Sequence, residues 1–135
     1  MLNIEVTKEK NVAIIKVSGE LDGQAYQNLI QNAQEVYKTG TKNILLDLSD
    51  LIYISSAGLV ALHFTALLAR GETLPDTDQG WRALKSVERT REGGAQKNVK
   101  LYNPRPEVLN VLDMTGFSTL FEIFTDKQKA INSFE

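Results

Sequence analysis

The stretch DLSDLIYISSAGL, residues 47–59, decides how this chain folds. Its first residues complete a hydrophobic strand, expected at Asn43 to Leu48, that ends at a polar turn. A second short apolar piece, Leu51 to Ile54, runs into two serines and a glycine, and a helical pattern begins at Leu59. The serines are therefore expected at or next to a helix N-terminus, where backbone N–H groups lack intrahelical partners and the helix dipole favours negative charge.

Two interpretations are open for these serines, Ser55 and Ser56. A serine hydroxyl at the start of a helix commonly caps it, which stabilises the helix by about 0.5–2 kcal/mol. The same position also suits a phosphate, because the unpaired N–H groups can donate hydrogen bonds to its oxygens. A capping serine can also carry a phosphate, so the two interpretations are compatible.

Strands and helices alternate on both sides of this stretch. The first two strands are expected to form a hairpin, residues 18–23 a loop, and the last strand an edge of the sheet. The predicted strands cover 2–7, 12–17, 43–48, 99–102 and 120–124, and the predicted helices cover 25–37, 59–69, 107–114 and 126–134. This alternation indicates an α/β layer structure with a mainly parallel or mixed sheet.

The chain length predicts a single domain over residues 1–135. One polar segment, residues 71–97, interrupts the alternation, and we interpret it as an insertion made of a loop and a short amphipathic helix from about Trp81 to Arg91. Trp81 either anchors the insertion on the domain or forms a partner surface with three nearby basic residues, Arg82, Lys85 and Arg89.

Composition excludes several classes of function. Fifteen basic and seventeen acidic side chains give a net charge of −2, so no strong field attracts nucleic acid or anionic lipid. The absence of cysteine excludes disulfides and thiolate sites. No apolar run approaches the ~20 residues of a membrane span, and the N-terminus lacks the pattern of a signal peptide. A cytoplasmic protein is the default expectation.

Catalytic and metal-binding patterns are also missing from the sequence. It contains no P-loop, GxGxxG, GxSxG or HExxH motif, so no enzyme is predicted. His63 is the only histidine, and we interpret it as a packing or surface residue rather than a metal ligand. No cofactor is expected.

Four elements in order along the chain resemble the STAS domain, the fold of the bacterial anti-sigma-factor antagonists. The resemblance covers nearly all of the chain except about residues 71–97. The matching elements are Gly19-Glu20-Leu21-Asp22, Asp47-Leu48-Ser49 with Leu51 and Tyr53-Ile54, Ser55-Ser56-Ala57-Gly58-Leu59, and Leu112-Asp113-Met114-Thr115-Gly116-Phe117 followed by residues 121–124.

The resemblance implies a small mixed β-sheet of about four to five strands, with the first strand at one edge and about four helices mainly on one face. It also implies that Ser56 is phosphorylated by an anti-sigma factor that is a serine kinase, and that the unphosphorylated form binds this kinase. Ser55 stands where many antagonists have aspartate, and Ala57 where many have a second serine or threonine. The implied partner-binding residues are Asp22, Asp47, Ser55, Ser56, Ala57, Gly58 and Leu59.

The partners expected from this resemblance are the anti-sigma-factor kinase and, as the opposing enzyme, a phosphatase. Exposed edge strands leave a weak homodimer open. An alternative role is a STAS scaffold or accessory module of a stress-sensing assembly or a membrane transporter, acting by contact without phosphorylation. Binding of a nucleotide or lipid is a third hypothesis with little support from the residues.

Overall fold

The computed structural model describes residues 2–69 and 96–134 of the chain. The insertion predicted at 71–97 lies outside these residues except for its last two positions, which begin a strand. The amphipathic helix predicted around Trp81, and both roles considered for that residue, also lie outside them.

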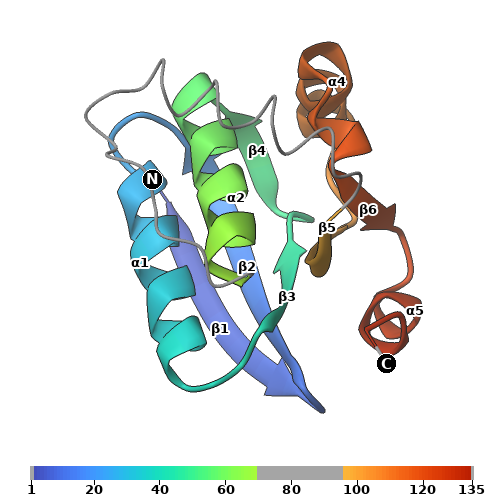
Figure 1. Cartoon of the computed structure of the whole chain (residues 1–135). Helices are drawn as coiled ribbons and strands as arrows, with labels where there is room; N and C mark the ends of the chain where they lie inside the picture. The colour runs from blue at the N-terminus through green and yellow to red at the C-terminus, as the bar shows by residue number, and fades with distance from the viewer. Residues whose placement is uncertain (1, 70–95, 135) are drawn as a thin grey trace.

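Six strands of the described residues form one mixed sheet (Figure 1). β1 (Asn3–Glu9) lies at one edge and pairs antiparallel with β2 (Val12–Leu21), as the predicted hairpin. The sheet order is β1-β2-β3-β5-β6, and β4 pairs with β2 beyond the end of β3. The remaining strands pair in parallel and are β3 (Asn43–Asp47), β4 (Leu51–Ile54), β5 (Gln96–Tyr102) and β6 (Phe121–Phe124). The predicted mixed α/β class is confirmed, with one strand more than expected.

Helices cover the two faces of this sheet unequally (Figure 1). α1 (Tyr26–Lys38) and α2 (Ser56–Ala69) pack side by side over one face. α4 (Pro106–Thr115) contacts β4 and is followed by a short 3₁₀ helix, η1 (Phe117–Thr119). α5 (Lys127–Asn132) packs on the opposite face. The prediction that the helices lie mainly on one face is therefore confirmed, with α5 as the exception.

Side chains that alternate along β3 enter two separate cores. Ile44 and Leu46 belong to the larger cluster under α1 and α2, whereas Leu45 belongs to a smaller cluster with Ala130 and Ile131 of α5. All three β3 side chains are fully buried. This burial on both faces explains why the sequence of β3 is almost continuously apolar.

β2 is longer than its sequence pattern suggests. The chain was expected to leave the sheet after Val17 and form a loop over residues 18–23, but β2 continues to Leu21. The reason is tertiary, because the last residues of β2 pair with β4. The register of this pairing shifts between Gly19 and Glu20, and Gly19 adopts a positive φ of 95°, which glycine tolerates.

α2 is also more deeply buried than expected. Its sequence predicts a single apolar stripe, yet every residue from Gly58 to Leu67 is buried. A helix that is hydrophobic on all sides belongs inside a protein rather than on its surface. α2 therefore acts as a central core element.

Helix ends are where local sequence signals succeed. Gly116 ends α4 in the left-handed conformation with φ of 80°, and Gly40 follows α1 with φ of 91°, as glycines directly after a helical pattern commonly do. Asp126 caps α5, since its carboxylate accepts a hydrogen bond from the Lys129 backbone N–H at 3.1 Å.

Candidate functional site

The two serines lie in a turn that joins β4 to α2, defined here as the serine turn, residues 55–58. The backbone N–H of Ser55 donates to the Leu21 carbonyl oxygen at 3.0 Å, which attaches the turn to the end of β2. The carboxyl ends of β2 and β4 therefore meet at the N-terminus of α2.

Ser55 caps α2. Its Oγ accepts a hydrogen bond from the Gly58 backbone N–H at 3.2 Å and donates to the Leu21 carbonyl oxygen at 3.3 Å. Its own carbonyl oxygen accepts the first helical bond, from the Leu59 N–H at 3.0 Å. The helix begins at Ser56, three residues before the start predicted at Leu59, because the cap and not the apolar periodicity fixes its first turn.

Ser56 is the first residue of α2 and is exposed. Within the described part of the chain, no hydrogen bond engages its hydroxyl. The two adjacent serines therefore differ in state: the hydroxyl of Ser55 is used to hold the turn, and the hydroxyl of Ser56 faces solvent.

Gly58 allows the turn to approach β2 closely. A Cβ atom at this position would lie 2.6 Å from the Leu21 carbonyl oxygen and 2.7 Å from Cγ1 of Ile54. Leu59 is 4% exposed and belongs to the main core. Gly58 and Leu59 therefore position the turn. Their contact with a partner stays a prediction, and their burial does not favour it. Ala57 is half-buried.

Asp22 lies next to the serine turn, directly after the β2 residue that binds Ser55. Its Oδ1 accepts hydrogen bonds from the backbone N–H groups of Gln24 and Ala25, each at 3.0 Å. An aspartate just before a helical pattern suggests the N-cap of a helix starting around Gln24, but α1 starts at Tyr26 with no side-chain cap. Asp22 instead fixes the tight turn that leads into α1.

Asp47 is separated from the serine turn. It pairs in register with Lys16, five β2 residues before Leu21, which places it about 16 Å from the turn at ~3.3 Å per residue. It is 7% exposed and accepts hydrogen bonds from the Ser49 N–H at 3.0 Å and the Ser49 Oγ at 2.6 Å. The structure thus brings Asp22 to the candidate site and leaves Asp47 to order the β3–β4 turn.

The charged residues next to Leu21, which binds the serine turn, are acidic. Glu20 and Asp22 flank Leu21, and residues 51–59 contain no charged side chain. Lys16 lies farther along β2 and forms an ion pair with Asp50 at 3.0 Å. The hydrogen bond with Asp50, and then its negative charge, raise the pKa of Lys16 above its usual value. Lys16 is therefore paired with Asp50 rather than with Glu20 or Asp22.

Two exposed apolar side chains precede the turn on β4. Ile52 is 49% exposed and Tyr53 is 51% exposed. Sequence reasoning missed this surface, because an apolar tetrad in a predicted strand suggests burial. One signal was available. Ile52 and Tyr53 are both large and point to opposite faces of β4, so both can be buried only if each face of this strand is covered by another layer.

The described residues, 2–69 and 96–134, show neither a cluster of metal-ligating side chains nor a membrane-spanning helix. Within these ranges, no group of three or more histidine, cysteine, aspartate or glutamate side chains is placed to hold a metal ion. No helix of the described residues is long and apolar enough to cross a membrane. His63 is 1% exposed and its ring packs near that of Phe64, with 6.1 Å between centroids.

Sequence comparison identifies one family. A family model described as Mlab, STAS domain, matches residues 4–75, slightly more than half of the chain. No curated protein sequence shows significant similarity to the chain.

Solved structures of the same fold extend over nearly the whole chain. An anti-sigma factor antagonist from Mycobacterium paratuberculosis is 19% identical, with a TM-score of 0.71, and the alignment covers 99% of this chain and 94% of that one. The anti-sigma factor antagonist SpoIIAA in its unphosphorylated form is 19% identical, with a TM-score of 0.63 and coverage of 96% and 94%. SpoIIAA of Bacillus in the phosphorylated form is 18% identical, with a TM-score of 0.52 and coverage of 100% of both chains. At these identities the likeness establishes the shared fold.

Proposed function

The chain belongs to the STAS domain family, and on that premise we propose that it is a non-catalytic regulator that antagonises an anti-sigma factor. In this proposal the unphosphorylated chain binds a serine-kinase anti-sigma factor through the serine turn. Phosphorylation of Ser56 by that kinase ends the complex, and a phosphatase restores it. The proposal places the protein in transcriptional control within the cytoplasm.

The observation that carries the proposal is the exposed Ser56 hydroxyl at the first position of α2. A phosphoserine adds about −1.5 to −2 charges and three acceptor oxygens. The helix N-terminus accepts such charge through its dipole and its unpaired N–H groups. Because Ser55 already caps α2, modification of Ser56 does not remove the bond that starts the helix.

A phosphate on Ser56 opposes binding through its surroundings. Ile52 and Tyr53, directly before the turn, are exposed apolar side chains that a partner could cover, and Glu20 and Asp22, which flank the residue that binds Ser55, are negative. A partner that covers these side chains would have to bury the new charge at the turn, unless it supplies a cation of its own. Burying an unpaired charge is strongly unfavourable, and about 1.4 kcal/mol already changes affinity tenfold.

Relatives of the same fold support a phosphorylation switch. SpoIIAA, an anti-sigma factor antagonist, is known in an unphosphorylated and a phosphorylated form, and this chain aligns with both over nearly its whole length. Ser55 in place of the aspartate found in many antagonists keeps the capping role, because serine and aspartate cap helices about equally well.

A phosphorylation assay with matched variants tests the proposal. The full chain is incubated with ATP and the serine-kinase anti-sigma factor of the same genome, and the modified site is located by mass spectrometry. We expect one phosphate in the wild type and in Ser55→Asp, and none in Ser56→Ala. A phosphate that persists in Ser56→Ala, or no phosphate in the wild type, would overturn the assignment.

The second candidate function is contact without phosphorylation, as a scaffold or accessory module of a stress-sensing assembly or a membrane transporter. The exposed Ile52 and Tyr53 favour a contact surface of this kind. Partner affinity distinguishes the two functions. Ser56→Glu should abolish binding in the antagonist and leave it unchanged in the scaffold, whereas Ile52→Ser with Tyr53→Ser should weaken binding in both.

A further inference from the structure

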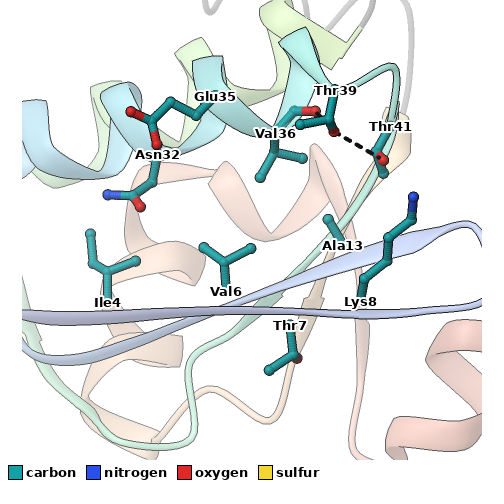
Figure 2. Close-up of a pocket in the computed structure, with 10 residues that line it drawn as sticks. All are labelled: Ile4, Val6, Thr7, Lys8, Ala13, Asn32, Glu35, Val36, Thr39 and Thr41. Atoms are coloured by element: carbon teal, nitrogen blue, oxygen red, sulfur yellow. Dashed lines mark hydrogen bonds between the residues drawn. The ribbon is translucent and has the colours of Figure 1, made fainter.

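A groove runs between β1 and α1, away from the serine turn (Figure 2). Its volume is about 530 Å³, which lies within the range of ~300–1,000 Å³ found for ligand pockets. Its apolar floor is made by Ile4, Val6 and Ala13, and Val36 of α1 faces them. Val6 is 45% exposed, although it lies on the core-facing side of β1 opposite Ile15.

The strand beside this groove has an open edge. Within residues 2–69 and 96–134, β1 pairs only with β2 and ends the sheet. The outer N–H and C=O groups of an edge strand are a template for one more strand. A strand added beside β1 would direct every second side chain into the groove, as in known cases of β-augmentation.

Opposite charges mark the two ends of the groove. Figure 2 shows Lys8 at one end beside Thr41, and Glu35 with Asn32 at the other end above Ile4. Both charged side chains are exposed. An occupant that carries an acidic side chain near Lys8 and a basic side chain near Glu35 would match both ends.

We propose that this β1–α1 groove binds an extended segment of a partner protein, which adds as a strand along β1. The segment has apolar side chains at alternate positions, between an acidic residue near Lys8 and a basic residue near Glu35. This site is independent of the serine turn, because Ile4 pairs with Val17, four residues or about 13 Å before Leu21.

An isolated segment fits this site better than a second copy of the chain. Joining two β1 edges in an antiparallel pair would place both α1 helices on the same face of one continuous sheet. Neighbouring strands lie about 4.8 Å apart, whereas packed helices need about 8–10 Å between their axes. Because α1 and β1 line the same groove, the two helices would compete for the same space.

Two blocked heptapeptides of identical composition probe the site. The first, acetyl-Glu-Thr-Val-Thr-Val-Thr-Lys-amide, matches the charges when it runs antiparallel to β1, and the second has the reverse sequence. Each is titrated into the ¹⁵N-labelled full chain up to about 1 mM while amide shifts and hydrogen exchange of β1 are followed. We expect the first peptide to bind more tightly, since antiparallel pairing is slightly more stable, and to slow exchange along β1.

Matched variants locate the binding surface. Val6→Lys should weaken binding at least tenfold, a loss of about 1.4 kcal/mol. Thr7→Lys should change it less than about twofold, ~0.4 kcal/mol, because the side chain of Thr7 points to the opposite face, paired with Ile14 (Figure 2). Exchanging the charges with Lys8→Glu and Glu35→Lys should reverse the preference between the two peptides. Circular dichroism confirms that each variant is folded.

Three results would overturn the proposal. The first is the absence of any shift in β1 with either peptide. The second is binding that survives Val6→Lys. The third is a doubled mass of the peptide-free chain in sedimentation, with β1 shifts that depend on protein concentration, which would identify a second copy as the occupant.

Discussion

At the scale of single residues, two neighbouring serines of the same chemistry have different environments. The Ser55 hydroxyl is held between the Gly58 N–H and the Leu21 carbonyl oxygen, and Ser56 is exposed one residue later. Ser55→Ala should therefore reduce stability by about 0.5–2 kcal/mol through the lost cap, while Ser56→Ala should have little effect on folding. Urea unfolding of the two variants measures this difference, and equal losses would contradict the assignment of the cap.

Gly58 gives a second prediction at this scale. Replacing it by alanine would force a Cβ to within 2.6 Å of the Leu21 carbonyl oxygen, and overpacking of this kind typically costs about 1–3 kcal/mol. Gly23→Ala is the matched control, because nothing lies within 4 Å of its added Cβ. We expect a clear fall in the melting temperature for Gly58→Ala and little change for Gly23→Ala. Similar stability of both variants would show that the close approach is not required.

At the scale of elements, a buried lysine adds polar contacts to the apolar packing of α5 on the sheet. The Lys100 Nζ donates to the Ser133 carbonyl oxygen at 3.1 Å and to the Ser133 Oγ at 2.9 Å. The same ammonium lies 3.7 Å from Glu122 and 4.7 Å from the centre of the Phe134 ring. These contacts join β5, β6 and the residues that follow α5, and they explain why a charged residue tolerates 4% exposure.

Lys100→Met tests this attachment. It keeps the apolar stem and removes the donor, so the Ser133 carbonyl oxygen loses its partner at a cost of about 1–3 kcal/mol. We expect faster hydrogen exchange in α5 and unchanged exchange in α2, which packs on the other face of the sheet. Lys127→Met, at the exposed first residue of α5, is the control and should leave exchange in α5 as in the wild type. Equal effects of the two variants would exclude Lys100 as the anchor.

At the scale of the whole molecule, the sheet separates three regions with different roles. The larger core under α1 and α2 supports the serine turn, the smaller core holds α5, and the open edge of β1 borders the groove. The proposed kinase surface and the proposed peptide groove lie about 13 Å apart along β2. The two proposed contacts therefore use different residues of the chain.

Removing residues 72–92 tests whether the rest of the chain folds as a single domain and binds its partner without this segment. These residues lie outside the two described ranges, whereas the serine turn and every strand described above lie within them. If the chain is a single domain, as its length predicts, we expect the shortened chain to unfold in one cooperative transition and still to bind the kinase. Loss of kinase binding by a shortened chain that remains folded would favour the scaffold function, with this segment as the contact.

Local sequence determined the order of elements, the helix-ending glycines and the pair of serines. Periodicity, caps and turn residues act between neighbours, so α4, α5 and the β1–β2 hairpin could be predicted within a few residues. The position of the candidate site, between a short strand and a buried helix, followed from the same signals together with the family resemblance.

Tertiary structure decided which of these residues are available and what surrounds them. The pairing of β4 with β2 extended β2 to Leu21, and the bond from Ser55 to that residue spans 34 positions of the chain. The β2–β3 register pairs Asp47 with Lys16, away from the turn. Packing also leaves Ile52 and Tyr53 exposed and a groove beside β1. The pattern of neighbouring residues cannot predict these contacts, because they form only when segments far apart in the sequence pack together.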